Sequence, residues 1–202
     1  MLRLDHVAVS AERLEDGAAA VQAALGVPMT GGGTHPAMGT HNRLLSLGDL
    51  YLEVIAIDPE ARAPDRPRWF DLDRFSGPPR LTNWIVACDD MEAALRHGPP
   101  GWGLPMQLAR GDYRWQMAVP ESGRLPFDNF FPALIRWQGM LHPAPALPDH
   151  GLRLARLEVS HPDARALRAA LPTLTDPRVA IGVGPPALRA VIDTPNGPRT
   201  LT

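Results

Sequence analysis

The chain has 202 residues, of which 45% are hydrophobic and 21% charged, enough to bury one sizeable core or two small ones. Its 20 basic residues are all Arg, and they are intermixed with 22 acidic residues to leave a net charge of −2. No basic stripe marks a nucleic-acid partner, and no apolar run approaches the roughly 18 residues of a membrane span. These patterns predict a protein that binds neither nucleic acid nor membrane.

The single cysteine, Cys88, rules out an internal disulfide and favours a reducing compartment. Charged residues appear too early in the opening sequence MLRLDHVAVS for the apolar core of a signal peptide. We therefore expect a cytoplasmic protein.

The first predicted element is a short strand, LDHVAVS, whose alternation places His6 on one face and Asp5 on the other. An amphipathic helix follows and ends at a glycine. Two strand-like segments, NRLLSLG and LYLEVIAI, then meet at a predicted turn of Gly48 and Asp49. This first unit is predicted to be β-α-β-β-β.

The same unit occurs a second time further along the chain. LTNWIVA at 81–87 repeats the opening strand, with Asn83 in the place of His6. Both copies reach a GVPM or GLPM sequence whose proline lies 22 residues after that position. The equal spacing predicts that the two units superpose and are related by a pseudo-two-fold axis.

A third and less regular copy begins at Leu154, and its strand-like segments are VAIGVG, ALRAVID and RTLT. Segments rich in proline and charge separate the copies. We therefore predict a first module at 1–58, a linker at 59–79, a second module at 80–141, a linker at 142–151 and a partial third module at 152–202.

Paired units of this kind resemble the glyoxalase-like domains of the vicinal oxygen chelate superfamily, which includes glyoxalases, extradiol dioxygenases and drug-sequestering proteins. The matching pieces are LDHVAV, GGGTHPAMGTHNRLLSLGDLYLEVIAI, LTNWIVA and LPFDNFFPALIRW, and together they cover residues 2–140. The resemblance implies an α+β fold in which βαβββ modules form cupped mixed sheets with the helices outside. A smaller third unit of βαββ type would complete it.

In this superfamily a metal often sits in the cup, held by the first and last strands of each unit. The resemblance places His6 and Glu53 at those positions in the first unit, and this ligand pair suits Zn, Mn, Fe or Ni. In the second unit Asn83 is a poor metal ligand, and the last strand, FFPALIRW, offers Arg136 but no carboxylate. Only two strong ligands are evident, so a divalent metal is implied but not required.

Simpler interpretations stay open for the same residues. His6 and Glu53 could form a buried pair without a metal, or Glu53 could pair with Arg136. His35 and His41, in the loop THPAMGTHN, could complete a site or serve only as loop polar groups. Three tryptophans could line a pocket or belong to an ordinary core: Trp84, Trp115 and Trp137.

Three functions follow as hypotheses. The first is a small-molecule enzyme of lyase, isomerase or dioxygenase type, with His6 and Glu53 catalytic. The second is a metal-free protein that binds or sequesters a small molecule. The third is a subunit whose third unit mediates a homodimer or covers the cup. In either of the first two, the predicted ligand contacts are Trp84, Asn83, Trp137, Trp115, Asn42, His35, His41 and Arg136.

Overall fold

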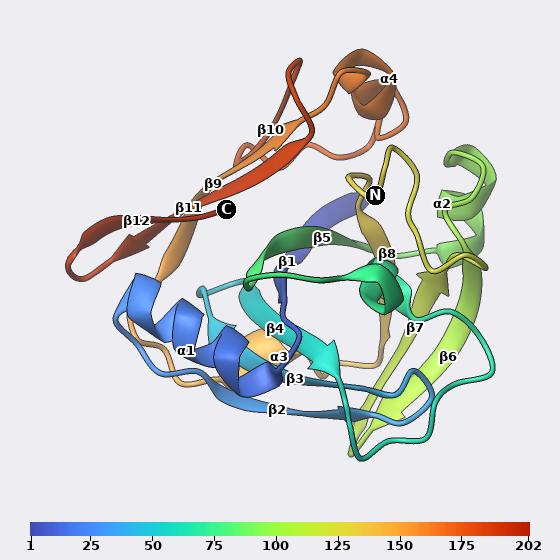
Figure 1. Ribbon diagram of the computed structural model, residues 1–202. Helices are drawn as coiled ribbons and strands as arrows, with labels where there is room; N and C mark the ends of the chain where they lie inside the picture. The colour runs from blue at the N-terminus through green and yellow to red at the C-terminus, as the bar shows by residue number, and fades with distance from the viewer.

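The computed structural model describes the whole chain, residues 1–202 (Figure 1). Its strands are β1 (Leu2–Ser10), β2 (Thr30–His35), β3 (Thr40–Ser46), β4 (Tyr51–Ile57), β5 (Arg80–Cys88), β6 (Leu104–Arg110), β7 (Tyr113–Val119), β8 (Ala133–Gln138), β9 (Arg153–Ser160), β10 (Val179–Gly182), β11 (Ala187–Thr194) and β12 (Gly197–Leu201). Its helices are α1 (Leu14–Leu25), α2 (Met91–His97), α3 (Pro143–Ala146) and α4 (Ala164–Ala169), with a 3-10 segment η1 (Trp69–Arg74). None of these helices has the length and apolar character needed to cross a membrane.

Eight strands form one curled sheet in the order β2-β3-β4-β1-β5-β8-β7-β6. At its centre β1 and β5 pair antiparallel, while β1 runs parallel to β4 and β5 runs parallel to β8. Outwards from the centre, each unit therefore places its strands in the same order: first, fourth, third and second. This arrangement confirms the predicted pair of βαβββ units, their pseudo-two-fold relation and the α+β class.

The last four strands form a separate sheet in the order β10-β9-β11-β12. Its first strand, β9, pairs parallel with the strand that follows it, β10, whereas β1 pairs parallel with the last strand of its unit. The third unit thus contains the same kinds of element as the other two, but its strands are arranged in a different order in the sheet. It lies over the outer side of the large sheet (Figure 1), where the Leu81 amide donates to the Thr202 carbonyl. The proposed module boundaries stay a prediction.

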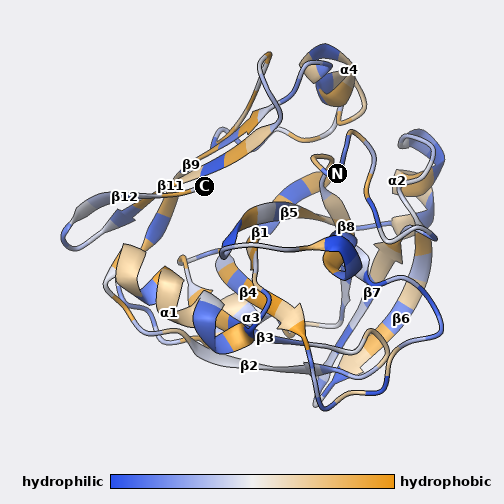
Figure 2. Ribbon diagram, in the orientation of Figure 1, coloured by the Kyte–Doolittle hydropathy of each residue, from blue (hydrophilic) through white to orange (hydrophobic).

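The two faces of the large sheet are buried in different ways. The outer face packs against α1 and the small sheet, and these layers share one continuous apolar core. Figure 2 shows hydrophobic residues recurring along α1 and β4. Helix α1 approaches closely because Gly17 has no side chain; a Cβ there would lie 2.5 Å from Val54 Cγ1. The concave face carries the polar side chains of the candidate site.

The sheet curls until its two edge strands, β2 and β6, come into contact. Strand β2 is rich in glycine, and a Cβ on Gly33 would lie only 3.0 Å from Arg110 Cδ. The bare backbone therefore leaves room for the Arg110 side chain to cross from the second unit to the first. Gly32 has φ +100°, and a Cβ there would lie 2.1 Å from the Asn42 carbonyl oxygen.

We expect Gly32→Ala to lower the free energy of unfolding by about 3 kcal/mol, because backbone must move to admit the methyl group. Gly26→Ala is the matched control, since Gly26 also has positive φ but a Cβ added there would have no atom within 4 Å. That control should lose only about 1 kcal/mol. Urea unfolding measures both, and equal losses would show that the crowding at Gly32 does not matter.

Candidate functional site

A small cavity lies on the concave face of the large sheet. The space open to the centres of water molecules is about 40 Å³, which holds a few waters at roughly 10–15 Å³ each. Its lining residues come from both units and from the connections that cover them. They are His6, His35, Asn42, Leu44, Tyr51, Glu53, Trp69, Phe70, Arg110, Trp115, Met117, Ile135, Trp137 and Pro143.

A bulge in β1 brings Asp5 and His6 together. The pairing of β1 with β5 shifts between Leu4 and His6, so that Asp5 is an extra residue opposite β5. Asp5 Oδ1 lies 2.5 Å from His6 Nδ1, and both side chains are buried. The predicted strict alternation, with Asp5 on the opposite face from His6, is therefore wrong at this point.

Asp5 is held by three nitrogen atoms. Besides His6, Trp137 Nε1 donates to Oδ2 at 2.9 Å, and His142 Nε2 lies 3.1 Å from the same oxygen. Burial by itself raises the pKa of Asp5, but hydrogen bonds from His142 and His6 lower it well below its usual value. Asp5 is therefore a buried carboxylate throughout the neutral range.

His6 lies between two carboxylates. Its Nε2 is 3.6 Å from Glu53 Oε2, which is an ion-pair distance but too long for a hydrogen bond. The ring stacks on Tyr51 with centroids 4.2 Å apart. Burial lowers the pKa of His6, but the hydrogen bond with Asp5 and the charge of Glu53 outweigh it and raise the pKa to about 9. At neutral pH His6 is an imidazolium whose Nε2–H faces Glu53 without a hydrogen bond.

Glu53 connects this pair to the far side of the cavity. Asn42 Nδ2 donates to Glu53 Oε1 at 2.6 Å, and Arg110 donates to Asn42 Oδ1 at 3.0 Å. Burial raises the pKa of Glu53, but its interactions with His6 and then His35 and Asn42 lower it below its usual value. Glu53 is thus ionised at neutral pH.

His35 is the second imidazole in the cavity and has the opposite protonation state. Burial lowers its pKa to about 4, so it is neutral at neutral pH. Its Nδ1 lies 3.1 Å from Thr40 Oγ1 and its Nε2 lies 3.4 Å from an Arg110 nitrogen. If Nδ1 carries the proton, Nε2 is the acceptor that faces Arg110.

A row of polar groups leads from the cavity to the surface. Glu53, His6, Asp5 and His142 follow one another, and the His142 side chain is 26% exposed. Asp5 and His142 also line a second hollow outside the cavity. The row therefore gives the buried carboxylates a connection to solvent through His142.

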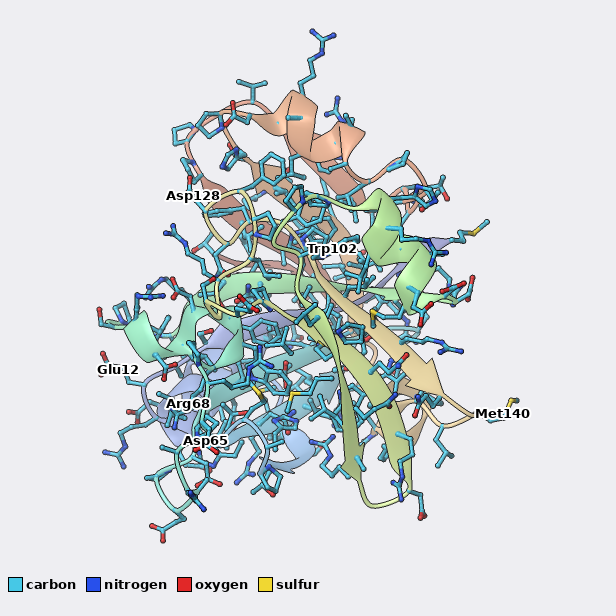
Figure 3. All side chains as sticks on the ribbon, turned by 90° about the vertical axis from the view of Figure 1, so that its right-hand side faces the viewer. Glu12, Asp65, Arg68, Trp102, Asp128 and Met140 are labelled. Atoms are coloured by element: carbon cyan, nitrogen blue, oxygen red, sulfur yellow. The ribbon has the colours of Figure 1, made fainter.

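Two aromatic residues of η1, Trp69 and Phe70, line the cavity, and we call this segment its cover. Phe70 and the next residue, Asp71, both have left-handed backbone, with φ of 61° and 57°. Asn129 holds this shape by donating to the Phe70 carbonyl, and Gly123 accepts from the Asp71 amide. Figure 3 shows Arg68, just before η1, on the same side of the molecule as the Asp128 loop. The cover is thus a strained segment fixed by a second loop.

The structure brings together six of the residues selected from sequence. His6, Glu53, His35, Asn42, Trp115 and Trp137 all line the cavity. The expectation that His6 and Glu53 lie close to each other is confirmed by the 3.6 Å separation. Which of these residues contact a substrate stays a prediction.

Four other selected residues do not line the cavity. Trp84 lies in the core on the outer side and donates from Nε1 to the Phe130 carbonyl, so its expected place in the cavity is wrong. Arg136 donates to Gln116 instead of Glu53. The Nε2 atom of His41 is buried and has no partner.

Asn83 is the fourth of these residues and occupies an unusual position. Its pairing with Ala8 places it on the same face as His6, but it does not line the cavity. The side chain is fully buried, and neither polar atom has a hydrogen-bond partner. The expectation that Asn83 reaches the cavity is therefore wrong.

Sequence reasoning missed several lining or supporting residues: Asp5, Tyr51, Trp69, Phe70, Arg110, His142 and Pro143. A signal for Asp5 was present, since an acidic residue beside a histidine in an apolar strand needs a partner. Pro143 and His142 lie in a segment expected to be a linker, and no local pattern links them to β1. Arg110 reaches the site only because the sheet closes on itself.

The residues present do not fit the metal centre that the resemblance implies. No group of three or more His, Cys, Asp or Glu side chains is arranged to hold a metal ion. His6 already uses Nδ1 for Asp5, and Glu53 Oε1 accepts from Asn42. The second unit adds the cation Arg110 to the cavity and no carboxylate. We therefore assign none of the chemistry of this site to a metal.

We expect Asp5→Asn to lower the pKa of His6 from about 9 towards or below 6.5, because the substitution removes a buried negative charge. The raised pKa stabilises the fold fully below pH 6.5, and this contribution is lost as pH rises through 9. As pH rises from 6.5 to about 9, the free energy of unfolding of Asp5→Asn should therefore fall less than that of wild type.

A pH titration of the histidine Cε1–H signals by NMR measures the shift. Asp89→Asn is the control, because Asp89 is an exposed carboxylate that pairs with Arg3 at the surface. It should leave the pKa of His6 unchanged. An unchanged His6 pKa in Asp5→Asn would mean that Asp5 does not hold the proton.

Comparison with known proteins agrees with this architecture. The model of the family described as glyoxalase-like domain matches residues 4–175. No curated protein matches the chain. A hypothetical protein from Staphylococcus aureus is similar in structure, with a TM-score of 0.57 and 13% identity over 85% of this chain and 74% of that one.

Two further structures align with part of the chain. One is a hypothetical protein from Bacillus halodurans, with a TM-score of 0.45 and 15% identity over 70% of this chain and 96% of that one. The other is methylmalonyl-CoA epimerase from Mycobacterium tuberculosis, with a TM-score of 0.44 and 16% identity over 70% and 91%. With the family match spanning most of its length, the chain belongs to the glyoxalase-like domain family of the vicinal oxygen chelate superfamily.

Proposed function

We propose that the protein is a small-molecule enzyme that moves a proton at a carbon next to a carbonyl group, an isomerase or lyase reaction. One observation carries this proposal: a carboxylate base and an imidazolium acid, Glu53 and His6, face one cavity 3.6 Å apart. A substrate placed against both would find a proton acceptor and a proton donor in their working states at neutral pH.

Each group has a defined role in the proposed reaction. Glu53 accepts the proton from the carbon. His6 donates a hydrogen bond from Nε2 to the carbonyl oxygen and stabilises the negative charge that develops there. Asp5 keeps Nδ1 of His6 engaged at 2.5 Å, so that the ring presents Nε2–H to the cavity. Asp5 acts through His6 and is a positioning residue.

The ion pair between Glu53 and His6 in the empty site must weaken for this reaction. The pKa of Glu53 is below its usual value partly because His6 is close, which makes Glu53 a weak base in the empty site. When a substrate oxygen takes the Nε2–H of His6, that stabilisation of the carboxylate weakens and its basicity rises. A cavity that admits only a few waters, covered by Trp69 and Phe70, strengthens both effects.

A metal-free binding protein is the second candidate. It is favoured by the aromatic wall of Trp69, Trp115 and Trp137, which suits a bound ligand without any reaction. The two candidates differ in what happens to a bound molecule, because only the enzyme exchanges a proton on carbon with solvent.

We expect the wild-type protein to speed the incorporation of deuterium from D₂O into carbons next to the carbonyl of small ketones or 2-oxo acids that it binds. Glu53→Gln should slow this exchange by at least about 100-fold, since an amide cannot accept the proton. Proton NMR follows the loss of the C–H signal, with EDTA present throughout.

Two results would contradict the enzyme proposal. One is a ligand bound in the cavity whose α-protons exchange no faster than in buffer, which would favour the binding protein. The other is exchange that persists in Glu53→Gln. Glu60→Gln serves as the control, because Glu60 is an exposed carboxylate outside the cavity.

We expect the exchange rate to have a bell-shaped dependence on pH. It should fall as pH rises through about 9, where His6 loses its proton, and fall again in acid as Glu53 becomes protonated below its ordinary value of 4.5. The profile of kcat/KM between about pH 3 and 11 measures this. An alkaline limb near 6.5, the ordinary imidazole value, would show that His6 is not the acid.

A further inference from the structure

Arg110 brings an uncompensated positive charge to the cavity. It makes no ion pair, and its guanidinium donates only to Asn42 Oδ1 and faces His35 Nε2. Gly33 leaves the space through which its side chain reaches them. An arginine presents five N–H donors, so most of its donors are left for another acceptor.

Trp69 supplies a second donor without a partner. Its side chain lines the same cavity and is only 4% exposed, yet its Nε1–H is buried without any hydrogen bond. A buried N–H left unpaired costs roughly 1–3 kcal/mol. Of the other four tryptophans, Trp84, Trp102 and Trp137 each donate to an oxygen, whereas Trp115 makes no hydrogen bond from Nε1.

Charge and size limit what could satisfy these donors. The carboxylates Asp5 and Glu53 lie on the His6 side of the cavity, and the positive Arg110 lies beyond Asn42 on the other side. An anion is repelled at the Glu53 end and attracted at the Arg110 end. Space for a few waters admits only a small molecule.

We propose that the cavity binds the carboxylate of a small organic acid, with Arg110 and Trp69 donating hydrogen bonds to it. Arginine matches the two oxygens of a carboxylate with two parallel N–H groups, and the Trp69 N–H supplies a further donor. The bound acid would then place the rest of its atoms towards Glu53 and His6. This inference rests on the proposed function, since it names the substrate class of the same site.

Binding without turnover tests the inference directly. Calorimetric titrations use acetate, propionate and pyruvate, each beside its uncharged amide, in low-salt buffer. We expect wild type to bind at least one of these acids, and to bind it at least about 10-fold more tightly than its amide. Arg110→Gln should weaken that binding by about 10- to 100-fold.

Matched variants separate a binding role from a structural one. Arg114→Gln, in the next strand, removes an exposed arginine that donates only to the carbonyls of Gly111 and Tyr113, and it should leave binding unchanged. Trp69→Phe keeps an aromatic ring but removes the unpaired N–H. It should weaken carboxylate binding about 3- to 10-fold while thermal stability is nearly kept, because no hydrogen bond is lost from the empty protein.

The inference is overturned if none of the three acids binds, if acids and amides bind alike, or if binding survives Arg110→Gln. These results are distinct from failure of the proposed function. Arg110-dependent binding of an acid without deuterium exchange would keep the carboxylate site and remove the enzyme. Exchange on neutral ketones that is insensitive to Arg110→Gln would keep the enzyme and remove the carboxylate site.

Discussion

The candidate site depends on the short contact between Asp5 and His6. Two adjacent residues in a regular strand point to opposite faces, so this contact needs the bulge in β1. Once formed, it fixes the protonation of His6, which in turn keeps Glu53 ionised in a buried place. A lone buried carboxylate would neutralise itself instead. The bulge is thus the feature of the backbone that permits a charged site inside an apolar cup.

The two units share a strand order, but they contribute different chemistry. The first unit supplies His6, Glu53, Asn42 and His35, whereas the second supplies mainly apolar and aromatic walls and one arginine. Asn83, at the place equivalent to His6, is buried without partners. A cup with ligands on both sides could surround a metal ion evenly. This one is acidic on one side and aromatic on the other, an arrangement that suits orienting an organic molecule.

The sequence allowed prediction of the fold and half of the site, and the limits have physical causes. Repeat spacing and alternation are local patterns, so the paired units and the closeness of His6 and Glu53 could be predicted from them. The bulge depends on how β1 pairs with β5, a strand far along the chain, and Arg110 depends on closure of the sheet. Trp84 was predicted to line the cavity, as Trp137 does, because sequence patterns do not distinguish the two positions. Only the register of the strands decides which tryptophan faces the cavity and which faces the core.

The cover over the cavity raises a last physical point. Trp69 and Phe70 close a space that holds only a few waters, and the left-handed backbone of Phe70 and Asp71 costs about 1–3 kcal/mol each. Such strain persists because Asn129 and Gly123 hold the segment from the neighbouring loop. A ligand that enters past these two side chains moves the cover, so part of its binding energy goes into opening the segment. A segment that is already strained when closed needs less of that energy, so the strain lowers the cost of admitting a ligand.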